Sequence, residues 1–174
     1  MSKNDFTPKS IALMGVLMGL QIVLTRFISI QTPFVRISFT FIAVVLMCMM
    51  FSPLVAGIGN ALADFIGITL FPVTAGFFPG FTLSAFLSAF LYGLFYYKKE
   101  MTLKRIITVN VIVTIVVNLG MNTFWLYLMY GPGIVANIPS RIVSSLILLV
   151  IHVVGTYWLA NVKVIQKQLV KFAS

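Results

Sequence analysis

The chain has 174 residues, of which 60% are apolar and 9% are charged, and its 12 basic side chains outnumber 3 acidic ones. A soluble domain carries about 25% charged residues, so this composition excludes an ordinary water-soluble protein. It also makes nucleic-acid binding a poor explanation of the positive charge, because lysines that flank membrane helices explain it better. We therefore predict an all-α integral membrane protein that forms a single membrane domain over residues 1–174, multi-pass in the cell membrane.

The apolar stretches predict six transmembrane helices, since roughly 17–25 mostly apolar residues are enough to cross a bilayer. Thr7 can cap the first helix, with Pro8 in its first turn, and Pro53 restarts a helix after the second, which is short for a full crossing. Gly and Pro residues predict a loop over 72–81 and end the fifth helix at 131–133. In chain order, the spans are expected at about 7–29, 38–51, 53–71, 82–97, 103–130 and 139–162.

The distribution of basic residues predicts the orientation, because cytoplasmic loops carry an excess of Lys and Arg. Six spans place both termini on one side of the membrane. That side holds nine basic residues: Lys3, Lys9, Lys98, Lys99, Lys104, Arg105, Lys163, Lys167 and Lys171. The opposite side holds three, which are Arg26, Arg36 and Arg141. We therefore expect cytoplasmic N and C termini.

The three arginines on the outer side are the first candidate for ligand binding. A guanidinium is a planar fork that matches a carboxylate, and two or three together suit a dicarboxylate ligand. The alternative is that Arg26, Arg36 and Arg141 are interfacial anchors whose charged ends reach the lipid headgroups.

Asp64 is the only acidic residue within a predicted span, about eleven residues from Pro53 and so roughly 16 Å along the helix. An intramembrane carboxylate is energetically costly and indicates function by default. Such a group would accept two hydrogen bonds from adjacent N–H donors of a heterocycle. The structural alternative is a salt bridge to Arg26 or Arg141.

Asn118, Asn122 and Trp125 are spaced four and three residues apart, which places them on one face of the fifth helix. Amide groups can bind the heteroatoms of a ring, and an indole can stack on its face. Interhelical hydrogen bonds and an interfacial tryptophan would explain the same residues without a ligand.

The two outer loops contain aromatic residues that could close over a ligand. These are Phe34 in the first loop and Phe77 and Phe78 in the second, where Gly76 and Gly80 would let the backbone move. A lid of this kind excludes water from a bound ligand. An aromatic belt at the membrane interface is the alternative.

A face of small residues on the first helix is formed by Ala12, Gly15 and Gly19. Small side chains allow close helix–helix approach in lipid. The face could pack inside the chain or dock to another membrane subunit.

Several chemistries lack their usual residues in this sequence. There is no phosphate-binding Gly-rich loop with its Lys, so the chain is not expected to hydrolyse ATP. His152 and Cys48 have no partners that suggest a nucleophile–base pair or a metal site. We therefore expect no catalytic residue, no metal and no cofactor, and we regard a small intramembrane enzyme or a purely structural subunit as the weaker alternative.

Several segments together resemble the S components, the substrate-binding subunits, of energy-coupling factor (ECF) vitamin transporters, and among them the folate family, FolT. The resemblance covers nearly the whole chain. The matching segments are Leu24-Thr25-Arg26-Phe27, residues 32–39 (TPFVRISF), residues 61–67 (ALADFIG), residues 77–83 (FFPGFTL), residues 118–123 (NLGMNT) and Pro139-Ser140-Arg141.

The resemblance implies a six-helix subunit of an ABC-type importer that binds folate from outside and delivers it inward. It implies a transmembrane coupling subunit (T component) and two cytoplasmic ATPases as partners, with outer loops as a lid. It would direct Asp64 and the Asn118–Trp125 group to the pterin and the three outer arginines to the glutamate carboxylates. Another flat vitamin or precursor, such as riboflavin, thiamine or a pyrimidine, is the alternative ligand.

Overall fold

The structure is a computed structural model that describes residues 7–31, 36–71 and 78–162. Its helices and two short strands follow one another along the chain with short connections. The elements are α1 (Pro8–Arg26), β1 (Ser29–Gln31), β2 (Arg36–Ser38), α2 (Thr40–Met50), α3 (Pro53–Leu70), α4 (Pro79–Tyr96), α5 (Leu103–Val113), the π-helical η2 (Thr114–Met121), α6 (Asn122–Tyr130), the 3₁₀-helical η3 (Gly131–Asn137) and α7 (Ile138–Asn161).

Five helical stretches within the described residues are long and apolar enough to cross a membrane. One of them, Leu103–Ile134, is a continuous run through α5, η2, α6 and the start of η3. Helix α2, which corresponds to the second predicted span, is shorter than these five. It has 11 residues and is therefore about 16 Å long, roughly half the thickness of a bilayer core. Strand β2 continues the same segment, so this part of the chain does not cross as a full-length helix.

Local sequence signals set the helix starts. The Thr7 side chain accepts a hydrogen bond from the Ser10 amide at 3.2 Å, as predicted for the first helix, and Pro8 occupies its first turn. Thr102 caps α5 in the same way, with the Arg105 amide as donor. Pro53 begins α3, where its missing N–H costs no helical hydrogen bond.

The described part of the chain departs from the predicted elements at three places. Helix α4 begins at Pro79 and not near residue 82, because a proline is well suited to a first helical turn. The fifth helix contains the π-helical segment η2, which the sequence pattern did not predict. The first outer connection contains a β-hairpin, in which Ser29, Ile30 and Gln31 pair antiparallel with Ser38, Ile37 and Arg36.

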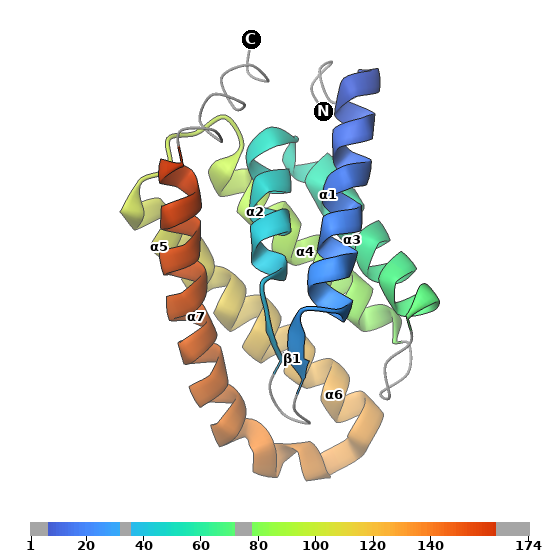
Figure 1. The fold of residues 1–174 in the computed structure, drawn as a ribbon. Coiled ribbons are helices and arrows are strands. Elements are labelled where there is room, and N and C mark those ends of the chain that lie inside the picture. The colour runs from blue at the N-terminus through green and yellow to red at the C-terminus, as the bar shows by residue number, and fades with distance from the viewer. Residues whose placement is uncertain (1–6, 32–35, 72–77, 163–174) are drawn as a thin grey trace.

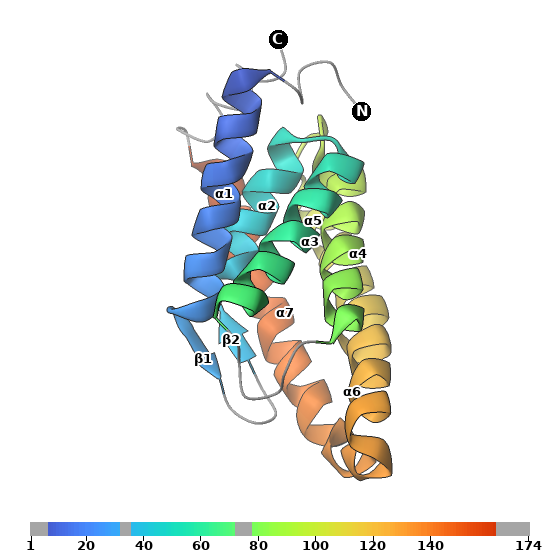
Figure 2. The same ribbon diagram turned by 90° about the vertical axis from the view of Figure 1, so that its right-hand side faces the viewer.

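The bundle has two different ends, which Figures 1 and 2 show from perpendicular directions. The start of α1 and the end of α7 lie toward one end, here called the terminal end. The β1–β2 hairpin, the start of α4 and the turn from α6 through η3 to α7 lie toward the other, here called the hairpin end. The two ends therefore differ in backbone structure as well as in sequence.

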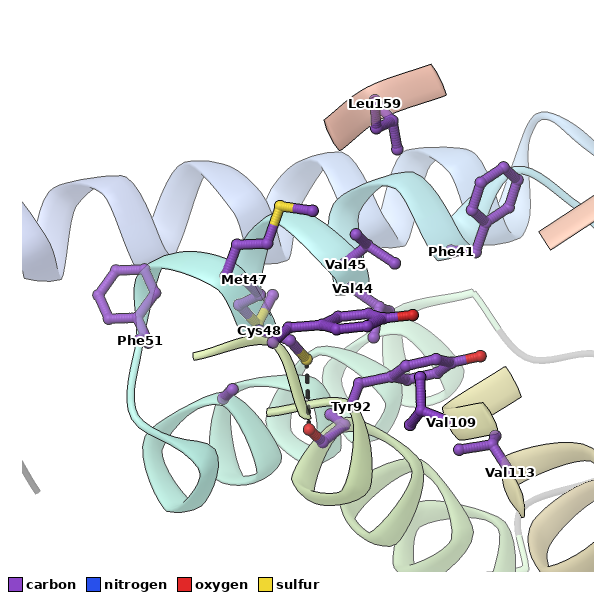
Figure 3. Packing of buried hydrophobic residues seen from close by; sticks show 14 of the residues in the cluster. Phe41, Val44, Val45, Met47, Cys48, Phe51, Tyr92, Val109, Val113 and Leu159 are labelled. Carbon is purple, nitrogen blue, oxygen red and sulfur yellow. Dashed lines mark hydrogen bonds between the residues drawn. The ribbon is translucent and has the colours of Figure 1, made fainter. Parts of the chain in front are cut away.

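The apolar core is centred on α2, which contacts α1, α3, α4 and α7. Met47 and Cys48 on this helix are completely buried. Figure 3 shows the side chains that converge there from α2, α4, α5 and α7, and the Cys48 thiol that donates to the Ala89 carbonyl oxygen at 3.2 Å. Cys48 is thus a packing residue, as its position in an apolar run indicated.

A buried polar contact ties α4 to α5 within this core. The Tyr92 hydroxyl donates to Asn110 Oδ1 at 2.8 Å, and Asn110 Nδ2 donates to the Tyr96 hydroxyl at 3.2 Å. These groups have no access to water, so their mutual hydrogen bonds remove a cost that each would otherwise carry. Asn110 therefore links helices, whereas the site lies elsewhere.

The outward faces of the helices are apolar. Side chains such as Val150 and Val154 on α7 are each 62% exposed, and Val16 on α1 is 66% exposed. A soluble monomer rarely presents a continuous apolar surface of this kind. Lipid is the environment that such faces require.

Candidate functional site

Arg26 ends α1 at the hairpin end and lies against α3. Its Nε and Nη1 atoms are buried and have no hydrogen-bond partner within the part of the chain that the structure describes. The guanidinium fits there because position 67 is a glycine: a Cβ on Gly67 would lie 3.3 Å from Arg26 Nε. Buried donors without partners are rare in folded proteins, so Arg26 has hydrogen-bonding capacity to offer an acceptor.

Asp64 on α3 lies within electrostatic range of Arg26. Its Oδ2 atom accepts a hydrogen bond from the Thr82 hydroxyl of α4 at 3.1 Å. Asp64 is half-buried. The proximity of Arg26 is compatible with the charge-pairing role considered for Asp64, because the two opposite charges interact.

Trp125 on α6 is fixed by contacts to the start of α4. Its Nε1 atom donates to Ser84 Oγ at 3.0 Å, and its ring lies 5.7 Å from that of Phe78, measured between centroids. A Cβ on Gly80 would lie only 2.5 Å from Trp125 Cδ2 and 2.5 Å from Phe78 Cε1. The two rings thus fill the space that the missing side chain of Gly80 leaves.

Gly80 lies in the first turn of α4 and is buried, so its predicted place in a loop is wrong. The reason is the helix start at Pro79, which extends α4 toward the hairpin end. In this position, Gly80 allows the close approach of two aromatic rings.

Asn122 and Asn118 lie on the same long helical run as Trp125. Asn122 Oδ1 is buried without a hydrogen-bond partner among the described residues, and it can therefore accept a hydrogen bond from a ligand. The backbone carbonyl of Asn118 accepts a hydrogen bond from Arg141 Nη2 at 3.3 Å. The side chains of both asparagines are half-buried.

Arg141 in the first turns of α7 already has partners in the protein. Besides the bond to the Asn118 carbonyl, its Nε atom donates to the Thr123 hydroxyl at 3.3 Å. Two of its donor groups are therefore used to hold α7 against η2 and α6, which leaves the remaining N–H groups for a ligand.

Some predicted residues cannot be placed with side chains. Arg36 lies in β2, opposite Gln31 in the hairpin, and its side chain lies outside the described residues. Phe34, Gly76 and Phe77 also lie outside them.

The small-residue face of α1 is separate from these groups. A Cβ on Gly15 or Gly19 would meet no atom within 4 Å, and Ala12 is exposed. Within the described part of the chain, this face is open.

Four contributing residues were not predicted: Gly67, Thr82, Ser84 and Thr123. Gly67 and Thr82 stand within segments of distinctive sequence, which is a weak signal. Thr123 carries the same weak signal, because it ends the segment 118–123. Ser84 carries none, because a small hydroxyl residue in an apolar helix is common and its partner lies on another helix.

Together, these groups supply the elements of a site for a flat, polar and anionic molecule. Arg26 offers unpartnered cationic donors, Asp64 and Asn122 offer acceptors, and Trp125 with Phe78 offers aromatic surface. Helix α4 lies between α3 and α6 and contacts both, so it connects the Asp64 contacts to the Trp125 contacts.

Comparison with known proteins identifies relatives over most of the chain. The family of substrate-specific components of ECF transporters matches residues 9–162. The folate transporter FolT of Clostridium novyi is 46% identical over 144 residues, which are 83% of each chain. The folate transporter FolT of Leuconostoc mesenteroides is 34% identical over 163 residues, which are 90% of this chain and 87% of the relative.

Solved structures agree with this relationship. A crystal structure of FolT bound with folic acid is 49% identical and superposes with a TM-score of 0.84, over 90% of this chain and 94% of the other. The S component of a bacterial ECF transporter at 24% identity shares the fold, with a TM-score of 0.61 over 88% and 96% of the two chains. The apolar spans and these matches show that the chain is a multi-pass membrane protein and belongs to the family of substrate-specific components of ECF transporters, which is a transporter family and not an enzyme family.

Proposed function

We propose that this chain is the folate-binding S component of an ECF importer of the ABC type, which binds folate at the hairpin end and delivers it inward. The observation that carries the proposal is the coincidence of two facts. Relatives called folate transporters are up to 46% identical over most of the chain, and the hairpin end gathers a cation, a carboxylate and an indole on neighbouring helices.

Folate has chemical groups that fit this arrangement. Its pterin is flat and carries adjacent N–H donors. Asp64 can accept from them, as can Asn122 Oδ1, which has no partner in the portion of the chain that the structure describes. Trp125 and Phe78 offer aromatic surface for stacking, and Asn118 lines the same helical run. We therefore assign this group of residues to the pterin.

The glutamate tail of folate carries two carboxylates, which the arginines would bind. Arg26 has two buried donors that find no partner among residues 7–31, 36–71 and 78–162, so it is the first candidate. Arg141 contributes through the N–H groups that Thr123 and the Asn118 carbonyl do not use. Arg36 remains a predicted third contact.

The orientation that we propose places both termini in the cytoplasm and the hairpin end outside the cell. In support, the basic connection between α4 and α5 and the start of α1 both lie at the terminal end (Figures 1 and 2). Positive residues accumulate on the cytoplasmic side of membrane proteins. Folate would then enter from outside, near the loops that carry Phe34, Gly76 and Phe77, which we still predict to form a lid.

The partners that we propose are a transmembrane coupling subunit and two cytoplasmic ATPases, in the cell membrane. The exposed face of Ala12, Gly15 and Gly19 would dock to the coupling subunit, since small residues permit close helix contact in lipid. The chain itself supplies the binding site, and ATP hydrolysis takes place in its partners.

Ligand titration of the purified chain tests the proposal directly. In the absence of ATP and of other subunits, the chain should bind folate saturably below the micromolar range. Riboflavin, thiamine and pyrimidines added in excess should not displace it. Displacement of folate by one of these compounds, or the absence of saturable folate binding, would contradict the assignment of the ligand.

The arginines can be tested by comparing folate with pteroate, which lacks the glutamate tail. Arg26→Gln should weaken folate binding strongly and pteroate binding much less, because the missing charge faces the tail. Lys98→Gln, a charge change at an exposed position of the terminal end, is the matched control and should change neither affinity. Equal losses for both ligands would place Arg26 at the pterin or in charge pairing with Asp64.

A further inference from the structure

The first two turns of α4 hold two of the groups that we assign to the pterin. The Thr82 hydroxyl donates to Asp64 Oδ2 at 3.1 Å, and Ser84 Oγ accepts from Trp125 Nε1 at 3.0 Å. We propose that Thr82 and Ser84 are positioning residues, which fix the carboxylate and the indole in the orientations that a pterin ring requires. This inference rests on the proposed function, and it concerns residues that do not themselves contact the ligand.

The two hydroxyl residues point to different neighbours because of their spacing. Residues two apart on an α-helix are separated by about 200° around the axis, so they lie on nearly opposite faces. Thr82 accordingly meets α3, and Ser84 meets α6. Helix α4 thus sets the distance between the Asp64 carboxylate and the Trp125 ring. This distance must match the distance between the N–H donors and the stacking face of the pterin.

The contact between Thr82 and Asp64 restricts the orientation of the carboxylate. A carboxylate on a flexible side chain can rotate, and only some orientations present an oxygen to each of two adjacent N–H donors. Fixing Oδ2 from α4 restricts this rotation. Asp64 also lies within electrostatic range of Arg26, so its position is determined from two helices.

The contact between Ser84 and Trp125 defines the plane of the indole. Ser84 is 3% exposed, and an indole N–H in a site without water needs such an acceptor. The same indole also packs against the Phe78 ring and against the backbone of Gly80, where there is no room for a side chain. A ring held in this way loses little conformational freedom when a ligand stacks on it.

The fluorescence of Trp125 provides a readout that general destabilisation would not reproduce. The chain has two tryptophans, and the second, Trp158, is 66% exposed on α7. Trp158→Phe therefore makes Trp125 the sole emitter. In this background, Ser84→Ala should shift the emission of the ligand-free protein and weaken folate binding about 3- to 10-fold, the effect of one hydrogen bond.

Ser88→Ala is the matched control for Ser84→Ala. Ser88 lies one turn further along α4, and its hydroxyl donates to the Ala85 carbonyl of the same helix at 2.9 Å. This variant should leave both the emission and the affinity unchanged. The fraction of protein that binds folate should stay constant in all variants, which separates an altered site from misfolded protein.

Thr82 is tested by an isosteric and a conservative change. Thr82→Val removes the hydroxyl at constant shape and should weaken folate and pteroate by the same factor, about 3- to 10-fold, because both carry the pterin. Thr82→Ser retains the hydroxyl and should restore the affinity. Rescue by serine would not be expected if Thr82 served only to fill space.

The outcomes separate this inference from the proposed function. Folate affinity within twofold of wild type in both Thr82→Val and Ser84→Ala overturns the inference, whatever the emission shows. If the wild-type chain does not bind folate, the proposed function is wrong. The affinities of Thr82→Val and Ser84→Ala are then compared with wild type for the vitamin that does bind.

Discussion

The glycine at position 80 makes the sharpest prediction about the site, because it is the point at which two aromatic rings meet α4. In Gly80→Ala, the new Cβ would lie 2.5 Å from Trp125 Cδ2, 2.8 Å from Trp125 Cε2 and 2.5 Å from Phe78 Cε1. Carbon atoms in contact are normally about 3.5–4.0 Å apart. Both rings must therefore retreat by about 1 Å or more.

The size of the effect follows from this displacement. Adding a methyl group to a well-packed site costs about 1–3 kcal/mol. If the displaced rings are those on which the ligand stacks, the same energy appears as a loss of affinity of roughly 5- to 150-fold. The Ser84 contact opposes any rotation of the indole, so we expect translation of Trp125 and a measurable change in its emission.

The assay is a folate titration of Gly80→Ala in the Trp158→Phe background. Gly15→Ala is the matched control: it is also a helical glycine, but its Cβ would meet no atom within 4 Å, and it should bind folate as the parent does. Unchanged emission and a folate affinity within twofold of the parent for Gly80→Ala would refute this account of how Trp125 is packed.

Three further predictions concern other parts of the molecule. Gly67→Ala should weaken folate binding two- to fivefold, because the new Cβ would lie 3.3 Å from Arg26 Nε and displace the guanidinium. Calorimetric titration measures the affinity of the variant, and an equal loss of affinity for folate and pteroate would contradict a role of Arg26 in binding the glutamate tail. Gly19→Leu should leave folate binding of the isolated chain intact but abolish co-purification with the coupling subunit, and normal co-purification would remove this face from the interface. Asn110→Leu should leave the Tyr92 hydroxyl without an acceptor, at a cost of about 1–3 kcal/mol, and lower the melting temperature by several degrees with no change in folate affinity.

The class of the protein and its mostly helical structure could be predicted from the sequence. Apolar composition requires lipid, and in lipid every backbone polar group must be bonded within the chain, which leaves helices as the simplest solution. Thr7 and Pro53 also set helix starts by local effects that the sequence displays. Asp64 and Arg26 could be singled out as candidates because charge is costly inside a membrane.

The helix ends near the site were less predictable. Pro79 is compatible with a loop or with a first helical turn, and the pattern of Gly and Pro around it favoured a loop. The structure has a helix there, and this changes Gly80 from a presumed hinge into a point of close packing. The π-helical segment η2 was not predicted either, because π-helices are rare and the apolar pattern of residues 103–130 is equally compatible with a continuous α-helix.

The order of the residues is enough to predict that the chain lies in the membrane, that most of it is helical, and that a few charged and aromatic residues stand where lipid does not favour them. Those properties depend on composition and on short-range patterns. The packed bundle was needed to show that Thr82 holds Asp64, that Ser84 holds Trp125, and that Gly67 makes room for Arg26. Each of these contacts joins two helices, and the relative rotation and height of two helices are set by the packing of the whole bundle and not by the residues of either one.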